Sequence, residues 1–111
     1  MPKGDARLRA HNGHSNQIAL RLKQRRTALK VTQEGLCARL AYVTGGAWNA
    51  DRQEIVRIEA GGRIVSDVEL IALAGALECH PCWLLLGDEA HGQAPQERQE
   101  LPFQGSDESS P

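Results

Sequence analysis

The chain has 111 residues, of which 24% are charged and 4% aromatic, and its formal net charge at pH 7 is −1. This length predicts one domain with a modest core, and since no apolar run is long enough for a membrane span or a signal peptide, we expect a cytoplasmic protein. The cysteines form an odd and sparse set, which argues against a secreted disulfide scaffold and favours reduced thiols: Cys37, Cys79 and Cys82.

The small net charge conceals an asymmetry between the two halves of the chain. Residues 1–63 contain 12 Lys and Arg against five Asp and Glu, which gives +7, whereas residues 64–111 contain one Arg against nine acids, which gives −8. Such a separation permits an electropositive face for a polyanionic partner on a nearly neutral protein. Solvated helix faces followed by an acidic tail are the alternative explanation.

Both ends of the chain are expected to lie outside the folded domain. Residues 1–15 are rich in Gly, His, Asn and Arg, which predicts a flexible N-terminal arm. Residues 88–111 consist mainly of Gln, Glu, Ser, Gly and Pro, which predicts a disordered acidic tail. The folded domain is therefore expected over residues 16–87.

Two helices are expected in the first part of this domain. Ser15 or Asn16 could cap the first helix, whose apolar residues fall on one side: Ile18, Leu22 and Leu29. Thr32 is a good N-cap for a second helix from Gln33 to Tyr42. Its apolar residues recur at i, i+4 and i+7: Leu36, Leu40 and Val43.

A third helix is expected to begin after Asp51, because Glu54 stands at the reciprocal position of a capping box. Its buried stripe would consist of Ile55 and Ile58, and Gly61-Gly62 would end it. Asn49 is the alternative cap, and it would leave Asp51 as an exposed acid. The connection from the second helix, residues 41–50, is longer than the usual turn of roughly three to four residues.

Two more helices complete the predicted domain. Ser66 and Glu69 repeat the capping-box spacing at the start of a fourth helix with these apolar residues: Leu70, Leu73, Ala74 and Leu77. A short fifth helix would have His80 as its cap, Pro81 at its first position and Gly87 at its end. No stretch shows a period of two, so the domain is expected to be all-α.

These helices, in this order, resemble the lambda-repressor and Cro-like helix-turn-helix domains of the XRE-type regulators. The resemblance is carried by LKQRRTALKVTQEGLCARL, EIVRIEAGGR and SDVELIALAGALECHPCWLLLG, which cover most of residues 18–87. Its most specific pieces are Thr32-Gln33 with Leu36, and Ile58-Glu59-Ala60-Gly61 followed by Arg63. It implies a five-helix lambda-repressor-like fold in a bacterial or phage-encoded DNA-binding repressor without a cofactor. No catalytic constellation suggests an enzyme.

The resemblance also implies roles for single residues. Gln33 would donate to a DNA phosphate, and Arg26 with Glu59 would form an ion pair that braces the first and third helices. Arg52 and Gln53 would face base edges in the major groove, where each bidentate contact discriminates by roughly 1–3 kcal/mol. The complete set of expected DNA contacts is Thr32, Gln33, Asn49, Arg52, Gln53, Glu54, Arg57 and Arg63.

Two members of this set, Glu54 and Arg57, have alternative roles of their own. Glu54 either caps the third helix or reads cytosine, and Arg57 is either solvent-exposed or bound to a phosphate. Arg63 would lie against the DNA backbone. Trp48, in the long connection, is expected to plug the loop onto the core with its indole N–H bonded, and base stacking or contact with the DNA backbone is the alternative.

The CHPC segment at residues 79–82 has the spacing of zinc knuckles and redox dithiols. A zinc site would also need His80 and the distant Cys37, so we expect no metal and buried structural thiols instead. Cys82 lies near a helix start, where the pKa of a thiol can be lowered, so a thiol-responsive or metal-responsive regulator that uses Cys79 and Cys82 remains an alternative.

The expected partners are an operator duplex and a second copy of the chain, because such domains act as two-fold dimers on pseudo-palindromic sites. The apolar segment from Trp83 to Leu86 is either the dimer surface or part of the core. The rival function is an antitoxin-like module of a toxin-antitoxin pair, with a tail that folds on a partner protein. Leu101 and Phe103 could dock there, or the tail only solubilises the domain.

Overall fold

The computed structural model describes residues 8–89. This part contains five α-helices, a final 3-10 turn and no β-strand, which confirms the predicted all-α class. In chain order the elements are α1 (Ala19–Ala28), α2 (Gln33–Val43), α3 (Arg52–Glu59), α4 (Asp67–Ala76), α5 (Pro81–Leu86) and the 3-10 turn η1 (Gly87–Glu89). Leu101 and Phe103, the expected docking residues of the tail, lie outside the described residues.

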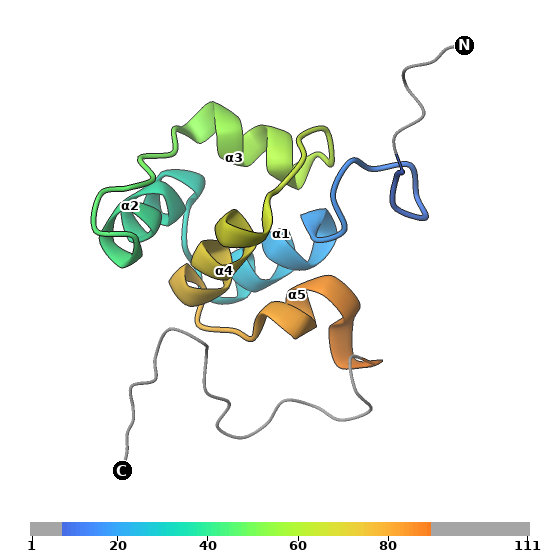
Figure 1. Ribbon diagram of the computed structural model, residues 1–111. Coiled ribbons are helices and arrows are strands. Elements are labelled where there is room, and N and C mark those ends of the chain that lie inside the picture. The colour runs from blue at the N-terminus through green and yellow to red at the C-terminus, as the bar shows by residue number, and fades with distance from the viewer. Residues whose placement is uncertain (1–7, 90–111) are drawn as a thin grey trace.

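The helices enclose one core, with α3 at the top of Figure 1 and α5 at the bottom. Helix α2 packs on α3 and α4, and α1 packs on α3 and α5. Val43 was expected on the apolar side of α2, but it is the last residue of the helix and is exposed. The fully buried large side chains come from every helix or its cap: Ile18, Leu22, Leu36, Leu40, Ile55, Ile58, Leu73, Leu77 and Leu84.

Four of the helices begin at the cap that the sequence predicts. Helices α3 and α4 both start with a complete capping box, in which side chain and backbone bond in both directions. These bonds satisfy amides that have no partner inside the helix. The four predicted caps are Thr32 for α2, Asp51 for α3, Ser66 for α4 and His80 for α5.

Helix α1 begins differently from the prediction. Its N-cap is Ile18, which has no side-chain cap bond, rather than Ser15 or Asn16. The Asn16 carboxamide accepts from the Ile18 amide at 3.0 Å and donates to the carbonyls of Ile58 at 3.1 Å and Arg63 at 2.9 Å. Asn16 therefore joins the start of α1 to the end of α3 and the loop after it.

Part of the predicted N-terminal arm is held against the same loop. Residues 10–14 form a turn, with the Gly13 amide 2.8 Å from the Ala10 carbonyl, and the Ser15 amide donates to Gly61 at 2.7 Å. Gly61 has a φ of +84°, and a Cβ there would overlap the ring of His14. This position after α3 therefore requires glycine for two reasons: its backbone is left-handed, and there is no room for a Cβ atom.

The connection between α2 and α3 follows the predicted break. Gly45 and Gly46 have φ values of +64° and +89°, and they turn the chain back after α2. Trp48 is half-buried against the core, and its backbone amide donates to the Thr44 hydroxyl at 3.0 Å. The loop is thus anchored on the core at Trp48, as expected, although within residues 8–89 the indole N–H has no hydrogen bond of the kind that was also expected.

Candidate nucleic-acid interface

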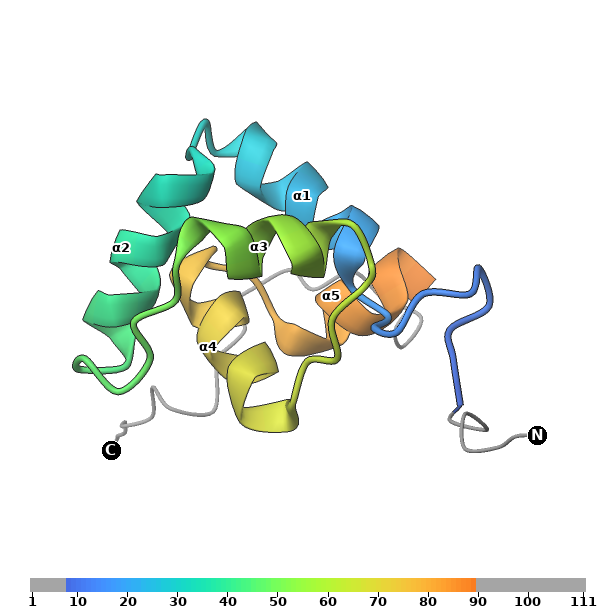
Figure 2. The same ribbon diagram turned by 90° about the horizontal axis from the view of Figure 1, so that it is seen from above.

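The outward face of α3 carries three exposed polar residues of the predicted site. Ile55 and Ile58 are fully buried on its inner side, whereas Arg52, Gln53 and Arg57 are exposed on its outer side. Figure 2 looks down on this helix, and no other described segment crosses over it. The structure therefore brings together the two residues expected to face bases and one expected beside them.

Val56 belongs to the same outward face, although the sequence analysis did not assign it. It is half-buried and stands one helical turn after Arg52. The signal that could have identified it is its i+4 spacing from Arg52. An apolar group among polar ones can distinguish thymine by its methyl group.

The predicted ion pair between Arg26 and Glu59 is present and nearly buried. The Arg26 Nε and Nη2 atoms lie 2.6 and 3.0 Å from the two Glu59 oxygens, and the side chains are 10% and 5% exposed. The Arg26 Nη1 atom also donates to the Val31 carbonyl at 2.8 Å. This bidentate pair joins α1 to α3 and fixes the orientation of α3, and so which of its sides faces outward.

Gln33 takes part in this pair, a contact that the sequence analysis did not foresee. Its Nε2 atom donates to the Glu59 carboxylate at 3.1 Å. Because a carboxamide nitrogen carries two hydrogens, one donor of Gln33 remains for another acceptor. The neighbouring Thr32 hydroxyl caps α2 by accepting from the Gly35 amide at 2.9 Å.

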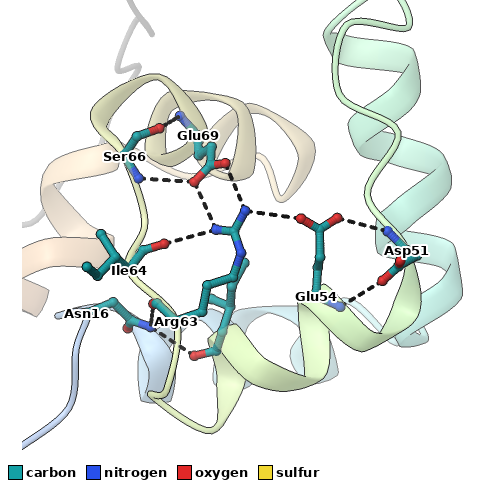
Figure 3. Close-up of polar contacts among 8 residues, drawn as sticks. Asn16, Asp51, Glu54, Arg63, Ile64, Ser66 and Glu69 are labelled. Atoms are coloured by element: carbon teal, nitrogen blue, oxygen red, sulfur yellow. Dashed lines mark hydrogen bonds and ion pairs between the residues drawn. The ribbon is translucent and has the colours of Figure 1, made fainter.

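Glu54 and Arg63, both expected near DNA, are partly buried and bound to each other in one cluster of polar contacts (Figure 3). The Arg63 guanidinium donates to both oxygens of Glu69, at 2.9 and 3.0 Å, and to Glu54 at 3.1 Å. Its side chain is 18% exposed. Arg63 is therefore directed at two glutamates of its own chain, rather than outward as its predicted contact with a DNA backbone would require.

Both glutamates are also the third helical residues of capping boxes. Glu54 accepts from the Asp51 amide at 3.2 Å while Asp51 accepts from the Glu54 amide at 2.9 Å, and Glu69 accepts from the Ser66 amide at 3.0 Å. Of the two roles considered for Glu54, the structure shows the cap. The hydrogen bond from Arg63 holds the pKa of the Glu69 carboxyl below its ordinary value.

Asn49, the alternative cap, is exposed and donates to the Gly46 carbonyl at 3.1 Å. It lies in the connection before α3, and Asp51 occupies the cap position instead. Trp48 lies close by, with the Arg63 guanidinium carbon 5.8 Å from the centroid of its ring. The connection is therefore attached to the same polar cluster as the starts of α3 and α4.

Three other arginines of the positive half are bound to helix ends. Arg21 donates to the carbonyls of Leu84 and Leu85 at 2.9 and 2.7 Å, at the end of α5. At the end of α4, Arg25 donates to the carbonyls of Leu77 and Glu78, and Arg39 to that of Ala76. These bonds satisfy carbonyls that have no partner inside their helices. Much of the positive charge thus serves the fold and does not form one continuous face.

None of the three thiols belongs to α3. Burial raises the pKa of the Cys79 thiol to about 11, so this thiol stays protonated at neutral pH, and burial also raises that of Cys37. Cys79 packs against the core, as predicted for a structural thiol, but Cys79 and Cys82 are both half-buried and not fully buried. Within residues 8–89, no three His, Cys, Asp or Glu side chains gather in a way that could hold a metal ion.

The apolar segment of α5 contributes mainly to the core. Leu84 is fully buried, and Trp83 and Leu85 pack partly buried against the core. The Trp83 indole donates to Asp88 at 3.1 Å, so the ordered chain continues past the predicted boundary at residue 87. Leu86 is 53% exposed, and it is the residue of this segment that remains for a dimer surface.

Comparisons with known proteins do not add to this geometry. No protein-family model, curated protein or solved structure matches the chain. None of the helices within residues 8–89 is long and apolar enough to cross a membrane. The candidate site is therefore judged by the residues that the structure brings together.

Proposed function

We propose that this protein is a sequence-specific DNA-binding regulator, a repressor, with a lambda-repressor-like domain in which α2 and α3 form the helix-turn-helix. The observation that carries the proposal is the outward face of α3. Arg52, Gln53 and Arg57 are exposed there on a helix whose other side is anchored by fully buried residues. A rigid helix with an uncovered polar face suits insertion into the major groove.

The chemistry of this face indicates how bases would be read. Arg52 can fork to guanine O6 and N7, and Gln53 can pair with adenine N6 and N7. Arg57, one turn further along α3, can bind a phosphate or a second base. Because the carboxylates of Asp51 and Glu54 already accept from amides at the start of α3, this helix start is a poor phosphate site.

Phosphate contacts would instead come from the region between α1 and α2. Lys30 is exposed in this turn, and Gln33 at the start of α2 retains one donor. Contacts of this kind set position and register on the duplex, while the side chains of α3 provide the preference for sequence. The affinity should therefore depend strongly on salt.

In vitro selection from a random duplex pool, followed by titration at two salt concentrations, tests the proposal. Wild-type protein should enrich a defined site. The double variant Arg52→Ala and Gln53→Ala should lose its preference for that site while its helical circular dichroism is unchanged. A matched pair on α1, Lys23→Ala with Gln24→Ala, removes one exposed cation and one exposed amide and should keep the preference. An unchanged preference in the α3 variant would contradict the assignment.

The proposal includes binding as a two-fold dimer to half-sites that are about one helical turn apart. The selected sites should then be pseudo-palindromic, and sedimentation should detect two copies of the chain on one duplex. The exposed side chain of Leu86 can contribute to the contact between copies. A selected site without internal symmetry, bound by one copy of the chain, would show that the protein recognises DNA as a monomer.

A further inference from the structure

Arg63 occupies the point where three segments of the fold meet (Figure 3). Its guanidinium binds Glu69 in the first turn of α4 and Glu54 in the first turn of α3. Its planar group also lies over the ring of Trp48 in the connection that leads into α3. The backbone carbonyl of Arg63 accepts from Asn16, so the residue itself is held in place from the other side.

This arrangement constrains the first turn of α3. Arg52 and Gln53 stand between Asp51 and Glu54, the two partners of the capping box. One Glu54 oxygen belongs to the box and the other accepts from Arg63. The position of the box relative to α4 therefore depends on Arg63. A displacement of this turn would move the two side chains proposed to read bases, and base readout depends on hydrogen-bond geometry.

We infer that Arg63 is a positioning residue for base recognition, which acts through Glu54, Glu69 and Trp48 and does not touch DNA. This inference rests on the proposed function. It replaces the contact with the DNA backbone that the sequence suggested for Arg63, because three of its donor bonds go to carboxylates of its own chain. Arg63 thus determines where the reading side chains stand.

A conservative variant distinguishes the two roles. Lysine keeps the charge and can serve a phosphate as a point charge, but it cannot fork to two carboxylates or stack its head group on an indole in the same way. Arg63→Lys should therefore lose discrimination between the selected duplex and a duplex with one changed base pair, by roughly fivefold or more. A phosphate contact would instead leave this discrimination unchanged in Arg63→Lys.

The decisive variant is Glu69→Gln, on the neighbouring helix. Glutamine can still complete the capping box of α4, but it removes the charge that binds Arg63. If Arg63 positions α3, this variant should lose discrimination as Arg63→Lys does, although it makes the protein less acidic. If Arg63 binds phosphate, removal of a nearby negative charge should leave discrimination intact and keep or increase the affinity.

The experiment is a titration of the full chain with the selected duplex and its one-pair variant, at several salt concentrations. The slope of affinity against salt should be the same in the wild type and Arg63→Met, whereas loss of a phosphate contact would lower it by about 0.9. Arg39→Met is the matched control, since it removes an arginine bound to a helix carbonyl at the far end of α4. It should preserve discrimination, and a loss equal to that of Arg63→Met would overturn the inference.

Amide exchange without DNA separates this inference from the proposed function. In Arg63→Met and Glu69→Gln the amides at the start of α3, such as that of Glu54, should exchange faster than in wild type and in Arg39→Met. Unchanged exchange would overturn the positioning role even in a protein that binds its site. If the protein binds no duplex, the proposed function and the role of Arg63 in recognition are both overturned. Faster exchange in the variants of such a protein would then show only that Arg63 links the starts of α3 and α4 mechanically.

Discussion

Between residues 19 and 63 the arginines form two groups, one bonded within the fold and one exposed. The bonded arginines donate to carboxylates or to carbonyls at helix ends: Arg21, Arg25, Arg26, Arg39 and Arg63. Arg52 and Arg57 are exposed on α3, and neither takes part in the ion pairs found within residues 8–89. A positively charged half of the chain therefore does not by itself predict a positively charged face. The arginines that the fold leaves unused mark the proposed interface.

The largest effect on this comparison should come from Arg26. Arg26→Met leaves the Glu59 carboxylate, which is 5% exposed, without its cationic partner. The free energy of unfolding should fall by roughly 3–5 kcal/mol, because an unpaired buried charge is costly. Denaturant unfolding followed by circular dichroism measures this change.

A double variant provides the control. Arg26→Met combined with Glu59→Leu removes both charges, so it should be clearly more stable than Arg26→Met alone. If the single variant is as stable as the wild type, the pair does not brace α1 against α3, and Arg26 does not belong with the bonded group.

A smaller effect is expected at the end of α5. Arg21→Met removes the donors to the Leu84 and Leu85 carbonyls, and the free energy of unfolding should fall by roughly 1–2 kcal/mol. Arg21→Lys keeps a charge at this helix end but not the paired donors, so its free energy of unfolding should lie between that of the wild type and that of Arg21→Met. Equal stability of all three proteins in urea would show that these carbonyls are satisfied without the arginine.

Acid should weaken the Arg63 cluster selectively. The pKa of Glu69 in the folded protein is lowered by its hydrogen bond with Arg63, so its contribution is present above the ordinary value of 4.5 and is lost as pH falls through the lowered pKa. At neutral pH, wild type should exceed Glu69→Gln by about 1 kcal/mol in free energy of unfolding. Urea unfolding at a series of pH values should show this difference shrinking below the ordinary value. A constant difference would contradict the linkage.

The smallest effect on stability is expected for the exposed arginines. Arg52→Ala and Arg57→Ala should each change the free energy of unfolding by no more than about 0.5 kcal/mol, since neither position is buried. The same variants should weaken binding to a selected duplex. Thermal unfolding and binding titrations on the same samples test both halves of this statement, and a strongly destabilised Arg57→Ala would show an unrecognised internal role.

Local signals made most of the helix starts predictable. A capping box needs two residues three positions apart, so Asp51 with Glu54 and Ser66 with Glu69 are visible in the sequence. Ile55 and Ile58 could be assigned to the core of α3 because their spacing is that of one helix face. These features depend on neighbours within one turn and not on the path of the chain.

The roles of Arg63 and Gln33 could not be predicted in the same way. Arg63 reaches Glu54 and Glu69 only because the chain turns at Gly61 and brings the starts of two helices to either side of it. Gln33 reaches Glu59 across 26 positions of sequence. Hydrogen bonds of this kind follow from tertiary packing, and a resemblance to a family assigned these two residues to DNA before their internal partners were visible.

The hydrogen bonds from Asn16 to the end of α3 and the loop after it can form only late in synthesis. Its carboxamide bonds to carbonyls 42 and 47 positions later, so the first helix cannot be secured until the ribosome has released the chain beyond residue 63. The helix ends that these arginines bind are synthesised later still: Arg25 binds the end of α4 and Arg21 the end of α5. The nascent N-terminal half should therefore stay open until nearly the whole described chain has emerged, and ribosome-bound chains that stop at residue 60 should be readily cleaved by protease.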